Sequence, residues 1–538
     1  MLRSQGRLGG WSTGPTPEPF FCPGRGRRVP AIFPAMKIAE GESYDVVIRG
    51  AAVYDGTGAP GVRADVAVRG DRIAAVGEVR GRGRQELDAA GAALAPGFID
   101  VHSHDDFAVL LDPLMPFKVM QGVTTDVVGN CGSGVVPFET GLRRFRRLHP
   151  DASPAPWDGF AGYLARVDET GPSVNVAVLM GHGSLRAGAM GLAQRPPDAA
   201  ELGKMKKWVS EGVAAGAVGL STGLIYEPGR YAATDEVVAL ARERGGAAGG
   251  LYATHMRNEA GGLLEAVREA IRVGEEGGVP VQISHHKASG RNNWGRVRDS
   301  LRLIEAARAR GLDVTADQYP YTAGSTSLAA VVQNGAFRHD SPGGIGELTA
   351  AEVLIASAPK HPAWEGRTLA ALAAEWGADA AAAAARIIEG EGEACFVVLF
   401  TMDETDVRTV LAHPTTMIGS DGVPAGGKPH PRLYGCFARI LGHYVREVKV
   451  LDLATAIHRM TGMPAAKFQL AERGAVRPGA FADLVVFDPA RIADVATYED
   501  PCRFPAGIRA VYVNGVTVAR DGVHTGARPG RGLRRART

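Results

Sequence analysis

Eight short apolar segments, each followed by a stretch of helical character, constrain the fold of this 538-residue chain most strongly. Buried strands that alternate with helices are typical of repeated βα units, and eight such units predict a TIM-like (β/α)8 barrel of the α/β class. In such a barrel the chemistry lies at the carboxyl ends of the strands. The predicted strands are 98–102, 125–131, 174–181, 217–222, 251–255, 280–285, 312–318 and 416–421.

Two histidines, His102 and His104, stand one residue apart where the first predicted strand ends. Residues i and i+2 of a strand face the same side, so both imidazoles can reach one metal ion. Histidines with a thiolate suit zinc, and a carboxylate beside them can handle protons, so we predict a hydrolytic metal site. The other strand ends contribute Cys131, His255, His285 and Asp421.

Each of these residues, taken singly, has a simpler interpretation. Cys131 could be a small apolar residue, His255 a core histidine, and Asp421 a turn residue before a glycine. His285 and His286 are adjacent and point to opposite faces, so we expect only one of them to be a ligand. The barrel changes this interpretation because it brings the ends of separate strands to one axis.

The two termini carry matching β-rich segments. We expect one small β-sandwich built from 43–95 plus 471–522, with the catalytic barrel at 96–470 between them. An insertion at about 325–396 is longer than a βα connection needs and contains an alanine-rich stretch of high helix propensity, 379–386. We interpret it either as a lid over the active site or as a peripheral excursion.

The ends and the composition limit the remaining possibilities. Residues 1–42 are rich in Gly, Pro and Arg and are predicted to be disordered, with Met36 as an alternative start, and a basic disordered tail is predicted at 523–538. Sixty basic residues balance 58 acidic ones, and long apolar runs are missing, so we expect a small-molecule partner rather than nucleic acid or membrane. Five scattered cysteines favour the cytoplasm. The oligomeric state cannot be inferred.

The order of these motifs resembles the amidohydrolase superfamily and, within it, the N-acyl-D-amino-acid deacylase (D-aminoacylase) family. The resemblance extends from Tyr44 to about Val518. It rests on Pro-Gly-Phe-Ile-Asp-Val-His-Ser-His-Asp-Asp at 96–106, Gly-Val-Thr-Thr at 122–125, Gly-Asn-Cys-Gly at 129–132, Gly-His-Gly-Ser-Leu-Arg at 181–186, Ser-Thr-Gly-Leu-Ile-Tyr-Glu-Pro-Gly at 221–229, Thr-His-Met-Arg-Asn-Glu at 254–259, Ile-Ser-His-His-Lys at 283–287, Gly-Ser-Asp-Gly at 419–422 and His-Pro-Arg at 430–432.

The resemblance implies zinc-dependent cleavage of the amide bond of N-acyl-D-amino acids to a carboxylate and a free D-amino acid. It assigns one tightly bound zinc to Cys131, His255 and His285, which selects His285 over His286, and a second, weaker metal position to His102 and His104. Asp421 matches the catalytic aspartate of the family. The substrate-binding positions match Lys287, Arg432 and Tyr319, although Tyr319 could equally be an aromatic residue of the barrel wall.

Two other functions stay open at this point. A cyclic-amide hydrolase of the dihydroorotase or hydantoinase kind shares the barrel, but such enzymes usually present a metal-bridging lysine where this chain has Cys131. A non-catalytic barrel serving as a scaffold would be expected to lack ligands. The preference for the D form rests on the resemblance alone, and the preferred side chain and acyl group do not follow from the residues.

Overall fold

The structure is a computed structural model, and it describes residues 43–147, 149–243, 250–333, 336–337 and 344–535. The extension predicted to be disordered, 1–42, and Met36 within it lie outside the described residues. The same holds for the last three residues of the predicted tail, 536–538, and for two short pieces of the insertion.

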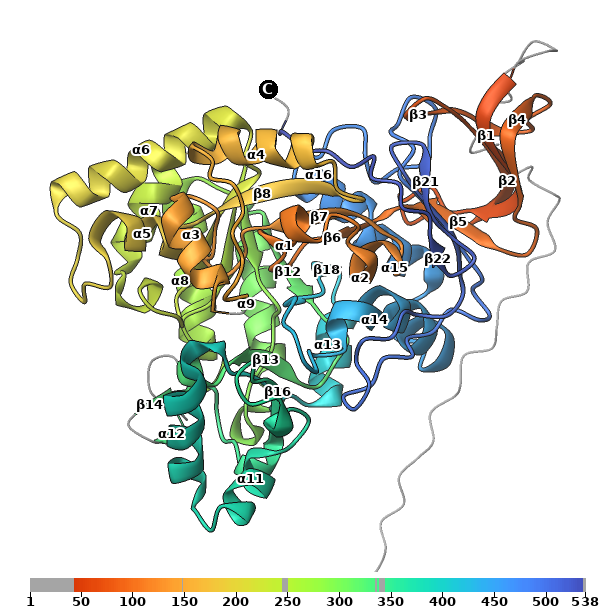
Figure 1. The fold of residues 1–538 in the computed structure, drawn as a ribbon. Helices are drawn as coiled ribbons and strands as arrows, with labels where there is room; N and C mark the ends of the chain where they lie inside the picture. Colours follow the sequence, from red (N-terminus) through yellow and green to blue (C-terminus); the bar gives the residue numbers. More distant parts are fainter. Residues whose placement is uncertain (1–42, 148, 244–249, 334–335, 338–343, 536–538) are drawn as a thin grey trace, which may run out of the picture. The chain divides into compact units, whose positions relative to one another are not determined.

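Eight parallel strands form one sheet that closes almost completely into a barrel (Figure 1). Each strand pairs with the next one along the chain, and every residue in the eight strands is buried, as expected for a parallel sheet covered on both faces. The predicted (β/α)8 barrel is therefore confirmed. The strands are β6 (Phe98–Asp100), β7 (Val123–Val128), β8 (Asn175–Gly181), β9 (Gly219–Gly223), β10 (Leu251–His255), β11 (Val281–Ile283), β12 (Val314–Gln318) and β18 (Thr416–Ile418).

Helices connect the strands and pack against them and against one another. In α8 (Leu263–Gly277) the buried residues Leu263, Val267, Ala270 and Gly274 recur at helical spacing and form the face that meets β11. A side chain at Gly274 would collide with Val281, so the glycine allows a close approach. Other connecting helices are α4 (Gly159–Thr170), α6 (Ala199–Ala215), α7 (Thr234–Glu243), α9 (Val297–Ala309), α13 (Glu404–Ala412) and α15 (Leu453–Met460).

Further helices lie in the connections around the barrel. None of the helices in the described ranges is both long and apolar enough to span a bilayer. They are α1 (Ala108–Leu111), α2 (Pro116–Val119), α3 (Phe138–Phe145), α5 (His182–Met190), α14 (Arg432–Arg439), the π-helix η7 (Ile440–Glu447) and α16 (Gly462–Lys467).

Strands from both ends of the chain build a second, nine-stranded mixed sheet. The two ends join where β5 pairs antiparallel with β19, and β4 is added beside β1. This confirms that one β unit is assembled from both termini. Its strands are β1 (Ser43–Val53), β2 (Val62–Arg69), β3 (Arg72–Gly77), β4 (Arg82–Asp88), β5 (Ala93–Pro96), β19 (Leu484–Phe487), β20 (Ile508–Val513), β21 (Val516–Arg520) and β22 (Val523–His524).

The C-terminal segment differs from the disordered tail expected at 523–538. Residues 523–535 are described, and their backbone pairs with the rest of the chain through β22 and a parallel bridge between Gly532 and Val176. Leu533 is buried, and its N–H donates to the Val176 carbonyl at 2.7 Å. Arg534 pairs with Asp168 at 2.8 Å. The basic residues therefore meet partners on the barrel that composition alone does not indicate.

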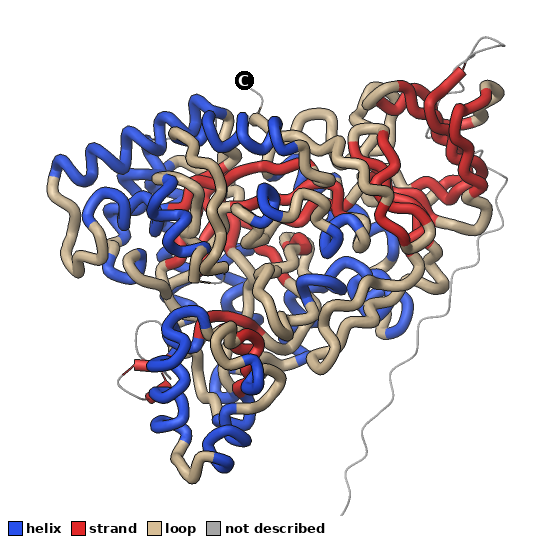
Figure 2. Tube along the Cα trace, in the orientation of Figure 1, coloured by secondary structure: helices blue, strands red, loops and turns tan. Residues whose placement is uncertain are grey.

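The insertion after β12 has its own buried core and contains both helix and strand (Figure 2). The alanine-rich stretch forms α12, which begins after the N-cap Asp379, as its helix propensity predicts. A three-stranded antiparallel sheet, which the sequence did not indicate, lies in the same segment. The elements are β13 (Gly324–Ser327), α10 (Leu328–Val331), β14 (Val332–Gln333), β15 (Ala336–Phe337), β16 (Val353–Ser357), α11 (Leu369–Glu375), α12 (Ala380–Glu391) and β17 (Phe396–Leu399).

Candidate metal centre and active site

The predicted site residues lie together at the carboxyl ends of the barrel strands. His102 and His104 follow β6, Cys131 follows β7, and His255 is the last residue of β10. His285 and Asp421 follow β11 and β18 in the same way. All are buried except His104, which is half-buried, so the cluster is shielded from bulk water.

Three of these residues have a left-handed backbone, which is uncommon for a residue with a side chain. The φ angles are 52° for Cys131, 35° for His285 and 50° for Asp421. Such a conformation costs on the order of 1–3 kcal/mol and persists only where the surroundings hold it. Here the Asp421 N–H donates to the His102 carbonyl at 2.7 Å, and the His285 N–H donates to Asp317 Oδ1 at 2.8 Å. The sharp turn after each strand directs the side chain toward the barrel axis.

Cys131, His255 and His285 form the first group of potential metal ligands. The Cys131 sulfur lies 3.7 Å from His255 Nδ1 and 3.6 Å from His285 Nε2. The neighbouring His286 instead has its Nε2 2.8 Å from Ser300 Oγ, and burial lowers its pKa to about 4. The structure thus places His285, and not His286, beside the other donors.

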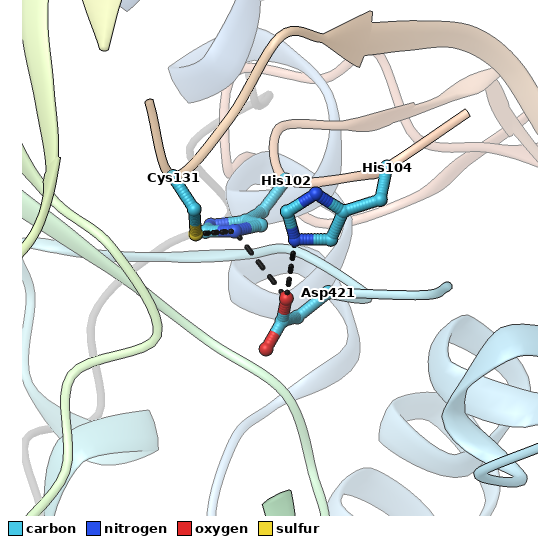
Figure 3. A group of neighbouring side chains, drawn as sticks. All are labelled: His102, His104, Cys131 and Asp421. Atoms are coloured by element: carbon cyan, nitrogen blue, oxygen red, sulfur yellow. Dashed lines mark hydrogen bonds and ion pairs between the residues drawn. The ribbon is translucent and has the colours of Figure 1, made fainter. Parts of the chain in front are cut away.

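A second group shares Cys131 and adds His102, His104 and Asp421 (Figure 3). His102 Nε2 lies 3.2 Å from the Cys131 sulfur and 3.4 Å from Asp421 Oδ1. His104 Nε2 lies 3.1 Å from the same carboxylate oxygen. In each group the ligand atoms all lie within 4.8 Å of one another. Cys131 therefore stands between two possible metal positions.

The charges in the cluster favour anionic donors. Burial alone would raise the pKa of the Cys131 thiol, but the neighbouring His102 and the other imidazoles hold that pKa well below its usual value. Burial would likewise raise the pKa of Asp421, which Arg432 and His102 instead hold well below its usual range. A thiolate, imidazole nitrogens and a carboxylate at this spacing fit zinc by ligand type.

Two carboxylates that sequence reasoning did not single out hold the histidines in place. Asp317 Oδ1 lies 3.2 Å from His102 Nδ1, and Glu259 Oε1 lies 2.9 Å from His285 Nδ1. Glu259 Oε2 also lies 3.7 Å from His255 Nε2. A carboxylate on the far nitrogen orients an imidazole toward a metal and raises its basicity. Each residue gave a signal, since Asp317 lies at a strand end and Glu259 closes the Thr-His-Met-Arg-Asn-Glu motif.

The three predicted substrate contacts lie beside the metal groups. Lys287 Nζ is 2.7 Å from Glu259 Oε1, and an Nη of Arg432 is 2.9 Å from Asp421 Oδ2. Both cations contact the Tyr319 ring, with the Arg432 guanidinium carbon 4.5 Å and Lys287 Nζ 5.8 Å from its centroid. Within the described ranges, Nε and Nη1 of Arg432 are buried without a hydrogen-bond partner.

A cavity of about 300 Å³ opens above this cluster and is bounded by the insertion. Thr326 donates a hydrogen bond to Tyr226 Oη at 3.3 Å, and Glu393 forms an ion pair with Arg147 at the cavity wall. The insertion thus contacts the barrel across the site, as a lid would. Its apolar contribution to the wall comes from Ala329, Ala330, Val331, Ile345, Phe396 and Leu399.

Comparison with known proteins agrees with this geometry. A model of the amidohydrolase family matches residues 85–519. The D-aminoacylase of Alcaligenes xylosoxydans xylosoxydans is 42% identical over 514 residues, which cover 93% of this chain and 99% of that protein.

Two solved structures extend the comparison to the fold. The N-acyl-D-glutamate deacylase of Bordetella bronchiseptica, complexed with zinc and a phosphonate that mimics the tetrahedral intermediate, has a TM-score of 0.83 and 41% identity, over 92% of this chain and 100% of that one. A D-aminoacylase studied for its binuclear metal centre has a TM-score of 0.82 and 42% identity, over 91% and 100% of the two chains. The chain therefore belongs to the D-aminoacylase family of amidohydrolases.

Proposed function

We propose that this protein is a zinc-dependent hydrolase that cleaves the amide bond of N-acyl-D-amino acids, releasing a carboxylate and a free D-amino acid. The observation that carries the proposal is the pair of donor groups sharing Cys131 at the floor of the cavity, with Asp421 beside them. Relatives with N-acyl-D-amino-acid deacylase activity in their names support the substrate class.

The donor geometry suggests which residues would hold the metal. Cys131, His255 and His285 would bind the tight zinc, because they supply a thiolate and two imidazoles oriented by Glu259. His102 and His104 would line a second, weaker position. When bound, zinc would supply a Lewis acid that lowers the pKa of water and polarises the acyl carbonyl.

Asp421 is suited to move the proton of the reaction. Its low pKa keeps the carboxylate ionised near neutral pH, so it can accept a proton from the attacking water. It then delivers that proton to the departing amine, which must be protonated to leave. Contacts with His104 and Arg432 hold the carboxylate in place for both transfers.

Lys287, Arg432 and Tyr319 would bind the α-carboxylate of the substrate. Arginine offers a planar fork that matches a carboxylate, and two buried guanidinium nitrogens of Arg432, Nε and Nη1, have no hydrogen-bond partner in the described part of the chain. Lys287 adds a second positive charge, 5.8 Å from the centroid of the Tyr319 ring. The anchor and the donor groups together would place the scissile amide above the floor of the cavity.

The wall formed by the insertion favours a neutral substrate side chain or acyl group. Its lining residues, such as Val331 and Leu399, are apolar, so they gain most from burying another apolar surface. Of the three cations in the cavity lining, Lys287 pairs with Glu259 and Arg147 with Glu393, and Arg144 lies 5.9 Å from the centroid of the Tyr226 ring. We therefore propose N-acyl derivatives of D-methionine-like amino acids as better substrates than those of D-glutamate.

The test is release of free amino acid from matched N-acetyl-D- and N-acetyl-L-methionine and from the two N-acetylglutamates. It is run on the purified protein, after removal of metal, and after return of zinc. Zinc-dependent release from the D compounds, faster for methionine, is the expected result. Hydrolysis of dihydroorotate or a hydantoin instead would identify a cyclic-amide hydrolase, and inactivity toward all these compounds with zinc bound would refute the proposal.

A further inference from the structure

Three of the six residues of the candidate metal centre, His102, His104 and Asp421, lie where the barrel closes. β6 and β18 are the end strands of the eight-stranded sheet, and the chain joins them just beyond their carboxyl ends through a parallel bridge between Ser103 and Gly422. The Asp421 N–H donates to the His102 carbonyl at 2.7 Å, and the His104 N–H donates to the Gly422 carbonyl at 3.1 Å. The relative position of Asp421 and the two histidines therefore depends on this contact between the ends of β6 and β18, which we call the seam.

A buried network of three residues crosses the same seam. Lys118, from α2, has its Nζ 2.6 Å from Asp100 Oδ2 and donates to Ser420 Oγ at 3.1 Å. Asp100 Oδ1 accepts hydrogen bonds from the backbone N–H of His102 at 3.2 Å and of Ser420 at 2.8 Å. One carboxylate thus holds the residue before Asp421 and the first histidine.

The hydroxyl of Ser420 continues the network. It donates to the His102 carbonyl at 3.4 Å and accepts the Gly422 N–H at 3.0 Å. Both residues that flank Asp421 are therefore fixed by this network, which helps to maintain the left-handed backbone of Asp421.

Lys118 supplies the positive charge on which the network depends. Its ammonium also lies 3.0 Å from Asp105 and 3.7 Å from Asp126, and none of these side chains is exposed. Burial alone would lower the pKa of Lys118, but the three carboxylates raise it well above its usual value, so the lysine stays charged. Breaking a buried ion pair on one side leaves an uncompensated charge, which is strongly unfavourable.

We propose that Asp100, Lys118 and Ser420 form a seam clamp that positions Asp421 against His102 and His104. They are positioning residues, since they act through the backbone of the site and do not touch the cavity. The kinetic part of this inference rests on the proposed deacylase function, whereas the metal-binding part does not.

The test compares Ser420→Ala and Lys118→Met with a matched control, Lys467→Met. The side chain of Lys467 is only 4% exposed, and it pairs at 2.9 Å with Asp313, which lies at the amino end of β12, far along the strand from the site. For each folded variant we would measure kcat and KM for N-acetyl-D-methionine and titrate Cd²⁺, counting the ions bound and their affinities.

If the clamp positions Asp421, Ser420→Ala should change some of these quantities and leave the others unchanged. Ser420→Ala should lower kcat and the affinity of the second metal position by roughly tenfold to a hundredfold, as expected for residues that orient ligands. The KM and the first metal ion, held by Cys131, His255 and His285, should change less than twofold. Lys467→Met should leave kcat and both metal affinities at wild-type values.

Unchanged kcat and unchanged metal affinities in folded Ser420→Ala would overturn the clamp. Because Lys118→Met risks unfolding, Ser420→Ala decides the question, since it removes one hydroxyl and keeps the ion pairs. If the wild-type protein does not hydrolyse N-acyl-D-amino acids, the proposed function fails and the Cd²⁺ titration alone judges the clamp. A weakened second position would then support it, and an unchanged one would refute it.

Discussion

Two buried clusters of charged side chains lie near the end of β6, and they are held together in different ways. In the lysine cluster, Lys118 provides a cation for Asp100, Asp105 and Asp126, none of which is exposed. In the pocket cluster the Cys131 sulfur is surrounded by imidazoles in the described part of the chain. The lysine cluster carries its own cation, whereas the pocket cluster is arranged to receive one from outside. The pocket cluster consists of His102, His104, Cys131, His255, His285 and Asp421.

The backbone shows the same contrast. Asp100, Lys118 and Asp126 lie within β6, α2 and β7, where the local conformation is regular. Cys131 and Asp421, in contrast, have left-handed φ angles just after their strands. Strained conformations that cost free energy are retained where they serve a site. The comparison teaches that buried carboxylates beside a cation of the chain itself lie outside the cavity, while donors that face a cavity mark the chemistry.

Removal of metal should have the largest effect and tests this contrast directly. Dialysis against a chelator is expected to abolish hydrolysis of N-acetyl-D-methionine, because the pocket cluster loses its cation, and added zinc should restore it. Circular dichroism should show that the secondary structure is retained, since the lysine cluster needs no metal. Full activity at a zinc content near zero would contradict the assignment of the pocket cluster.

Asp421→Asn separates proton transfer from metal binding. We expect kcat to fall by about 10²- to 10⁴-fold, the usual contribution of a general acid or base. The zinc content should stay unchanged, because Cys131, His255 and His285 remain. Steady-state kinetics and metal analysis of the same preparation check both statements. A variant with the wild-type rate would show that Asp421 does not carry the proton.

Glu259→Gln tests the carboxylate behind the metal ligands. Glu259 contacts His285 and Lys287, so its amide replacement should weaken zinc affinity by about 10- to 100-fold. Competition with a chromogenic chelator measures this change. A suitable control is Glu269→Gln, which removes another partly buried carboxylate that pairs with Arg257 at 2.8 Å outside the pocket cluster. Equal losses in both variants would point to general destabilisation.

The barrel and most members of the pocket cluster could be predicted from the residues, whereas the choice of His285 over His286 came from the resemblance to the family. Strand periodicity placed His102, Cys131 and Asp421 at strand ends, and barrel geometry brings such ends together. Lys118 could not be recognised in this way, because a lysine on a short helix carries no pattern that indicates burial against three carboxylates. The left-handed φ angles of Cys131 and Asp421 were equally invisible, since residues other than glycine seldom adopt them.

The insertion and the tail show a second limit. Alanine-rich helix α12 follows from local propensity, whereas β13, β16 and β17 form a sheet from segments far apart in the chain, and their pairing depends on tertiary contacts. The basic composition near the C-terminus predicted a solvated tail. Leu533 and Arg534 nevertheless meet Val176 and Asp168 on the barrel.

The smallest effect is expected at a third charged contact, the ion pair between Arg147 and Glu393 at the cavity wall. Unlike both buried clusters, its side chains are 42% and 49% exposed. Exposed ion pairs contribute roughly 0.2–1 kcal/mol, because water screens the charges and two long side chains lose freedom. Glu393→Gln should therefore change KM for N-acetyl-D-methionine by less than about fivefold.

The dependence of KM on salt also tests whether this ion pair helps to hold the insertion against the barrel. If the pair helps the insertion to stay against the barrel, raising the salt concentration should shift the wild-type KM toward that of Glu393→Gln, since salt screens exposed charges. The variant itself should be less sensitive to salt. A hundredfold loss of kcat/KM would instead mean that this exposed pair matters as much as the buried clusters. Burial of a charged contact would then no longer predict how strongly that contact affects activity.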